Sequence, residues 1–160
     1  MSDSSQAETV NPPNPLEKAK NGEGPVSLDP NELQRAEESV EKLAEDYSSF
    51  AQADVDRIKA AIARAEQNPA ERSDALADIY TRALDLKGQG GGFGYNMITS
   101  IGDLLTKFLE GNEDLSSREF EIVHAHVDAM QAVLREEMKG GGDKIGVQIV
   151  DGLAQLVQKA

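Results

Sequence analysis

The chain contains 160 residues, enough for one domain of ordinary size and too few for two full hydrophobic cores. Its 29 acidic residues exceed its 16 lysines and arginines, and a formal net charge of −13 disfavours binding to nucleic-acid phosphates or anionic lipid surfaces. There is no cysteine, which excludes disulfides, thiolate metal sites and cysteine nucleophiles. No apolar run reaches the roughly 18 residues that a membrane span needs, and no signal peptide is recognisable, so we expect a cytoplasmic protein.

The first 28 residues differ in composition from the rest of the chain. Residues 1–28 are rich in Ser, Asn, Pro, Gly and charge and hold few apolar side chains, which predicts a disordered leader. At residues 29–32 an N-cap aspartate, a proline at the first helical position and a glutamate three residues after the cap predict the first helix. We therefore expect the folded domain to span residues 29–160.

The first helical segment carries apolar residues at alternating spacings of three and four. This pattern predicts one stripe that faces a partner, and the stripe consists of Leu33, Ala36, Val40, Leu43, Tyr47 and Phe50. The apolar pattern then changes phase and continues as Ala51, Val55, Ile58, Ile62 and Ala65. We expect a break in the helix at residues 51–54, where the phase changes.

Four further segments show helical signals. Residues 68–71 repeat the Asn-Pro start signal, and the helix that follows meets five glycines between residues 88 and 94, which on helix propensity predict a loop. Amphipathic stretches follow at residues 97–109, at 116–139 with a capping box of Ser116 and Glu119, and at 145–156 with Ile145, Ile149, Leu153 and Leu156. No alternation typical of strands occurs, so the sequence predicts an all-α fold, an up-and-down four-helix bundle with additional N- and C-terminal helices.

The glycine-rich stretch at residues 83–95, ALDLKGQGGGFGY, is the most distinctive motif. It does not fit a phosphate-binding P-loop, because Lys87 precedes the glycines and no strand precedes them. It resembles the signature of histidine-containing phosphotransfer (HPt) domains of bacterial two-component phosphorelays, which reads Ala-His-x-Leu-Lys-Gly followed by small or variable residues, an apolar residue and Gly. The matching positions, without a gap, are Ala83, Leu86, Lys87, Gly88, Phe93 and Gly94. The resemblance covers residues 68–110 well and implies an HPt-like bundle.

One position departs from this family pattern. Leu84 stands where the family has its phosphorylated histidine, and a leucine offers no lone pair to attack an aspartyl phosphate. Asp85 lies on a different side of the helix and does not replace the histidine. The resemblance therefore implies a pseudo-HPt protein that is not an enzyme and that binds a receiver domain or a histidine kinase without carrying phosphate.

The residues that would form this docking surface follow from the resemblance: Leu84, Lys87, Gly88, Gln89 and Gly91. In the family, the lysine would neutralise the phosphoryl group and the small residues would leave room for a partner. Two alternatives remain open at this point. The glycines can serve close helix packing instead, and Leu84 can belong to the core if the helix is rotated.

The two histidines are the other candidates for phosphate chemistry. His124 and His126 are two residues apart, so they point to different sides of a helix and form no shared metal site. They flank the apolar stripe of their helix, where we expect half-buried side chains. Either can act as an alternative phosphoacceptor in an active phosphotransfer protein, and a third interpretation is a helical interaction module outside two-component signalling. The sequence predicts no cofactor, no metal site and no catalytic triad.

Overall fold

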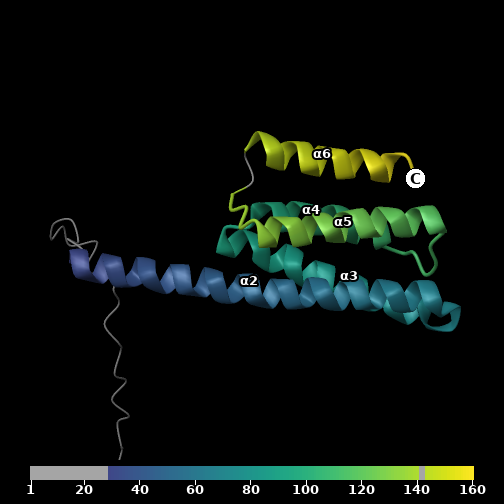
Figure 1. Ribbon diagram of the computed structural model, residues 1–160, viewed down its shortest axis with the longest axis horizontal. Helices are drawn as coiled ribbons and strands as arrows, with labels where there is room; N and C mark the ends of the chain where they lie inside the picture. Colours follow the sequence, from purple (N-terminus) through teal and green to yellow (C-terminus); the bar gives the residue numbers. More distant parts are fainter. Residues whose placement is uncertain (1–28, 141–142) are drawn as a thin grey trace, which may run out of the picture. The chain divides into compact units, whose positions relative to one another are not determined.

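The computed structural model describes residues 29–140 and 143–160 (Figure 1). The chain divides into two compact units, Met1–Ala36 and Glu37–Ala160. Of the first unit, only the residues from 29 onward are described, and they form the start of the first helix of the structure. The predicted leader, residues 1–28, lies outside the described residues.

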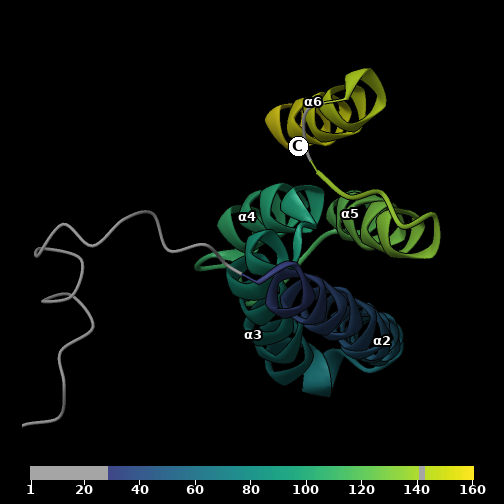
Figure 2. The ribbon, with the colours of Figure 1, turned by 90° about the vertical axis from the view of Figure 1, so that its left-hand side faces the viewer.

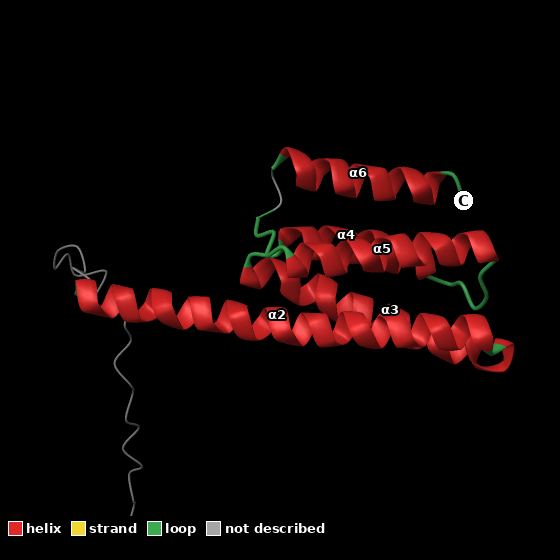
Figure 3. Ribbon diagram, viewed as in Figure 1, coloured by secondary structure: helices red, strands yellow, loops and turns green. Residues whose placement is uncertain are grey.

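The described residues form five α-helices and no strand (Figure 3), which confirms the all-α class. The helices are α2 (Pro30–Gln67), α3 (Arg72–Gly90), α4 (Asn96–Leu109), α5 (Ser117–Arg135) and α6 (Lys144–Gln158), with 3₁₀ turns at Pro69–Glu71 and Gly91–Phe93. Within the second unit, successive helices run in opposite directions (Figure 1). Helix α6 lies against α4 and α5 (Figure 2).

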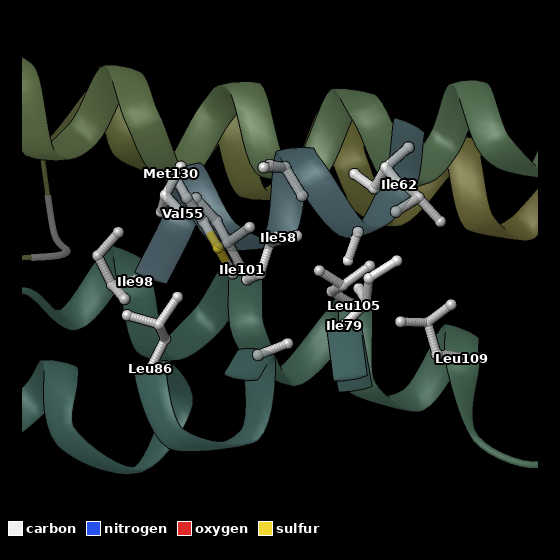
Figure 4. Close-up of a cluster of buried hydrophobic side chains, with 14 of the residues drawn as sticks. Val55, Ile58, Ile62, Ile79, Leu86, Ile98, Ile101, Leu105, Leu109 and Met130 are labelled. Atoms are coloured by element: carbon white, nitrogen blue, oxygen red, sulfur yellow. The ribbon is translucent and has the colours of Figure 1, made fainter. Parts of the chain in front are cut away.

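The core of the second unit is a continuous cluster of aliphatic side chains (Figure 4). Its centre combines residues of four helices, namely Val55, Ile58 and Ile62 of α2, Ile79 and Leu86 of α3, Ile98, Ile101 and Leu105 of α4, and Met130 of α5. At one end the rings of Tyr47 and Phe93 stack with their centroids 4.6 Å apart. Helix α6 contributes Leu153 to this cluster.

Helix α2 begins as the sequence predicts but does not break at residues 51–54. The Asp29 side chain accepts a hydrogen bond from the Asn31 N–H at 3.0 Å, as an N-cap does. The helix then runs without interruption to Gln67. No glycine or proline occurs at the change of apolar phase, and the bundle buries Ala51 and Val55 while it leaves Phe50 outside. Residues 30–67 therefore form one helix. The predictions of a break at residues 51–54 and of a separate additional N-terminal helix before it are wrong.

The apolar stripe predicted on the first half of α2 is mostly uncovered by described residues. Tyr47 is buried, but Val40, Leu43 and Phe50 are 65%, 56% and 72% exposed. The bundle instead covers the side of α2 that carries Ala44, Ala51 and the later apolar residues. On α6, likewise, Leu153 is buried and Ile149 is half-buried, whereas Ile145 and Leu156 are exposed.

Helix α3 continues into the glycine-rich segment, so the predicted loop is wrong for its first half. The α-helix includes Gly88 and Gly90, a 3₁₀ turn follows, and the chain reverses at Gly94, whose φ of 83° is left-handed. Tertiary contacts offset the low helix propensity of glycine here: Gly90 packs against α4, and the Gly91 N–H donates a hydrogen bond to Thr99 Oγ1 at 2.9 Å.

Helix α5 starts with the predicted capping box of Ser116 and Glu119 but ends at Arg135, four residues before the expected end at Lys139. A Schellman motif terminates it: the Glu137 N–H donates to Leu134 O at 3.2 Å and the Met138 N–H donates to Val133 O at 2.9 Å. Glu137 occupies the left-handed position of this motif with a φ of 49°. An L-residue other than glycine is strained in that conformation.

Two glycines of α3 allow a matched test of this packing. A Cβ at Gly90 would lie 2.9 Å from Tyr95 O and 3.1 Å from Ile98 Cβ, so we expect Gly90→Ala to lower the free energy of unfolding by about 1–3 kcal/mol. A Cβ at Gly88 would meet no atom within 4 Å, and we expect Gly88→Ala to raise it by about 0.5–1 kcal/mol. Urea unfolding measures both values, and equal effects would contradict the close approach at Gly90.

The left-handed Glu137 offers a second test. We expect Glu137→Gly to raise the free energy of unfolding by about 0.5–1 kcal/mol, because relief of the strain exceeds the extra backbone entropy of glycine in the unfolded chain. Thermal unfolding checks this value. Glu137→Ala is the control, since it removes the charge but keeps the strain, and it should leave stability nearly unchanged.

Candidate functional site

The face of α3 that carries the HPt-like motif is open to solvent. Leu84 is 44% exposed, although its neighbours Ala83 and Leu86 are buried in the core. Leu84 therefore lies outside the core, which excludes the alternative in which a rotated helix buries it. Lys87 and Gly88 follow one turn later, on the same side of the helix, with Lys87 half-buried and Gly88 exposed.

The glycines of the motif divide into two groups with different roles. A Cβ at Gly88 or Gly92 would lie in open space, and a Cβ at Gly91 would make only ordinary contacts of 3.5 and 3.6 Å. Gly90, in contrast, lies against the backbone and side chains of α4. The two interpretations of the glycines are therefore both needed: Gly90 serves helix packing, Gly88, Gly91 and Gly92 leave the surface without bulky side chains, and Gly94 takes the left-handed conformation of the turn.

A second close approach lies directly behind the exposed face. A Cβ at Gly102 of α4 would lie 2.9 Å from Lys87 Cβ and 3.1 Å from Ala83 O. Because a larger residue does not fit there, α4 supports the α3 backbone at the turn between Leu84 and Lys87. Gly102 thus positions the candidate face, although it is not part of the glycine-rich motif.

The ammonium group of Lys87 is held by an acidic residue of α4. Lys87 Nζ lies 2.8 Å from Asp103 Oδ1, and Lys107 Nζ lies 2.7 Å from Asp103 Oδ2. Hydrogen bonds from Lys107 and Lys87 lower the pKa of Asp103, and the hydrogen bond to Asp103 raises the pKa of Lys87. Asp103 and Lys87 are therefore charged at neutral pH, and the formal charges of Lys87, Lys107 and Asp103 sum to one positive charge.

Thr99 links the end of α3 to the start of α4. Its hydroxyl accepts the hydrogen bond from the Gly91 N–H and donates one to Lys87 O at 3.0 Å. Lys87 O is one of the last four carbonyls of α3, which lack donors within the helix. Thr99 therefore fixes the conformation of the glycine-rich segment next to the candidate face.

Gln89 and Gly91 complete the residues that the resemblance assigns to docking, and both are exposed. Gly91 lies two turns after Leu84, on the same side of the chain. Gln89 follows Leu84 by five residues, which on an α-helix places the two on different sides. The structure thus brings together Leu84, Lys87, Gly88 and Gly91, and it leaves Gln89 at the side of this group.

The two histidines occupy different environments, and only one is at the boundary as expected. His124 is partly exposed, and its Nε2 lies 3.2 Å from Glu66 Oε1 of α2. His126 is completely buried: its Nδ1–H donates to Ile122 O at 2.8 Å, and its Nε2 has no partner among the described residues. Burial lowers the pKa of His126, so the ring is neutral. A buried ring presents no nitrogen to a docking protein, which leaves His124 as the accessible histidine.

Sequence reasoning missed Asp103, Gly102 and Thr99. The pair of Asp103 and Lys107 has the four-residue spacing of a helical ion pair, which is visible in the sequence. The contacts of Lys87 with Asp103 and Gly102 depend on how α3 and α4 are aligned across the glycine-rich turn, and no local pattern encodes that alignment.

Comparisons with known proteins identify no relative of this chain: no protein-family model, curated protein or solved structure matches it. Within residues 29–140 and 143–160, no helix is long and apolar enough to cross a membrane, and no group of three or more His, Asp or Glu side chains is arranged to hold a metal ion.

The buried His126 makes stability depend on pH in a defined direction. Its pKa in the folded protein is lower than the ordinary value of about 6.5, so below that pH the unfolded chain binds more protons than the folded one. Stability is then lost as the pH falls from about 6.5 toward the folded pKa. We expect the melting temperature of the wild type to fall between pH 7.5 and 5.5, and that of His126→Leu to fall less.

His124→Gln is the matched control for this measurement, because His124 is partly exposed on the same helix. It should retain the pH dependence of the wild type. If the melting temperatures of the wild type and His126→Leu fell equally between pH 7.5 and 5.5, His126 would not be the cause of the loss of stability.

Proposed function

We propose that this protein is a pseudo-HPt module that binds a receiver domain or a histidine kinase of a bacterial two-component system and carries no phosphate itself. The observation that supports this most directly is the half-exposed Leu84 beside the open space at Gly88 on α3. An exposed apolar side chain with no bulky neighbour one turn away is suited to insertion into a pocket of a partner.

The helical arrangement is consistent with the proposal. In an HPt-like bundle, the position of Leu84 would face solvent in the middle of a helix, with the lysine one turn further on. Here Lys87 keeps that place, and Asp103 balances its charge at 2.8 Å. With a leucine at position 84, this face can bind a partner but cannot accept a phosphoryl group there, because the side chain has no nucleophilic nitrogen. The proposal places the protein in the cytoplasm, where receiver domains act.

One alternative follows from the histidines. A phosphotransfer protein that uses another acceptor would need an accessible imidazole, and His124 meets that condition, with its Nε2 near Glu66. His124 is not followed by the Lys-Gly pair of the motif. We therefore keep His124 as the second candidate and assign the binding role to the α3 face.

The test is to incubate the protein with phosphorylated receiver domains encoded in its own genome and to follow both complex formation and label transfer. We expect complexes without label on the wild type. Gly88→Trp fills the open space on the α3 face and should weaken the complex about tenfold or more without a loss of stability. Gly152→Trp is the matched control, because Gly152 is an exposed helical glycine of α6 with nothing within 4 Å of its Cβ position.

Two further variants separate the alternatives. If position 84 has the geometry of the family's acceptor, Leu84→His should accept phosphoryl label from a receiver domain that binds the wild type. Label on the wild type that disappears in His124→Ala would instead identify an active phosphotransfer protein and overturn the binding-only proposal. An equal loss of binding in Gly88→Trp and Gly152→Trp would show that the α3 face is not the contact surface.

A further inference from the structure

In the second unit, the residues of α2 that precede Ala44 are exposed to solvent. All residues from Glu37 to Leu43 are exposed, and the first buried side chains are Ala44 and Tyr47. Helical segments of this length gain most of their stability from packing rather than from propensity. We therefore expect this part of α2 to be packed against a partner.

An apolar stripe runs along this uncovered segment. Val40, Leu43 and Phe50 are all more than half exposed, and with Tyr47 between them they follow the three-four-three spacing of a coiled-coil seam. Tyr47 is already buried in the bundle, where its ring stacks on that of Phe93 with the ring centroids 4.6 Å apart. Leu43 and Phe50 lie one turn to either side of Tyr47, so the exposed stripe is continuous with the core. The spacing indicates that the missing partner is a helix.

The charged residues of this segment indicate which kind of helix would bind to it. Residues 37–50 contain five acidic side chains and one lysine, and the exposed acids include Glu37, Glu41, Glu45 and Asp46. With Val40 and Tyr47 at heptad position a, Glu37 falls at e and Asp46 at g, next to the apolar stripe, whereas Glu41 and Glu45 lie on the far side of the helix. A cationic partner would be attracted to Glu37 and Asp46 and to the excess of acidic residues in this segment, whereas a second copy of α2 would bring another acidic surface against it.

We propose that Val40, Leu43 and Phe50 of α2, with their acidic flanks, form a docking surface for a basic amphipathic helix of another protein. The apolar side of that helix would cover Leu43 and Phe50, and its lysines or arginines would face Glu37 and Asp46 at the edges of the stripe. This surface is separate from the α3 face around Leu84 and does not depend on the function proposed for that face.

The experiment uses the full chain and a synthetic helix as the probe. The probe is a fluorescent 21-residue peptide with leucines at seam positions and lysines elsewhere, and binding is measured by fluorescence anisotropy. Two control peptides share its length: a scrambled one with the same charge and no apolar side, and one with glutamates in place of lysines. We expect binding by the first peptide alone, weakened by added salt because exposed charges contribute.

Variants then locate the binding surface. Leu43→Ser and Phe50→Ser should each weaken peptide binding about tenfold or more, because both side chains would lie at the centre of the contact. Ile145→Ser on α6 is the matched control, since Ile145 is 59% exposed and Leu43 is 56% exposed. It should leave the peptide affinity unchanged. Hydrogen exchange on the complex should show new protection of the amides of residues 37–50.

Several results would overturn the proposal. Equal binding of the scrambled peptide would show that charge alone attracts the probe, and binding of the glutamate peptide would show that the acidic flanks play no part. An Ile145→Ser variant that loses as much affinity as Phe50→Ser would place the contact elsewhere. A dimer in sedimentation that Phe50→Ser dissociates would identify the occupant as a second copy of the chain.

Discussion

The close approach of α3 and α4 determines where the residues of the candidate face lie. At Gly90 and Gly102 the two helices come so near that a single Cβ would lie about 3 Å from atoms of the opposite helix. With that approach in place, Lys87 reaches Asp103, and Thr99 reaches both Lys87 O and the Gly91 N–H. The orientation of α3, and hence the exposure of Leu84, follows from these contacts. The motif residues are thus presented by a support that lies mostly on α4.

Local signals predicted most of the helical structure. The caps at Asp29 and Ser116 mark the starts of α2 and α5, Asn68 caps the 3₁₀ turn that precedes α3, and the absence of strand patterns matches the all-α fold. Local rules failed where tertiary contacts outweigh propensity. Gly88 and Gly90 remain helical because α4 packs against the end of α3, and α2 crosses residues 51–54 unbroken because its change of apolar phase moves Phe50 out of the core rather than bending the chain.

The candidate site shows the same division between local and tertiary information. The exposure of Leu84 agrees with the expectation from the HPt-like motif, whereas the complete burial of His126 does not agree with its expected place at the boundary. Helix periodicity places a residue at the edge of a stripe, but the width of the stripe depends on how many helices pack there. Helix α5 contacts α4 and α6 and forms an ion pair with α2 between Asp128 and Lys59, so its covered side is broad and includes His126.

The two surfaces proposed for binding differ in their chemistry. The α3 face is small, bears one leucine and carries Lys87 and Lys107 around the single carboxylate of Asp103. The α2 stripe is longer, more apolar and strongly acidic. Two proteins of opposite character could therefore bind the same chain without competing for residues.

The continuity of α3, the glycine-rich turn and α4 along the chain also bears on folding kinetics. These elements occupy residues 72–109, so their mutual contacts close only short loops and cost little chain entropy. The contacts of α2 with α5, such as the ion pair between Lys59 and Asp128, join residues much further apart in sequence. We expect the α3–α4 hairpin to form early in folding, so that the candidate face takes shape before the rest of the bundle closes around it.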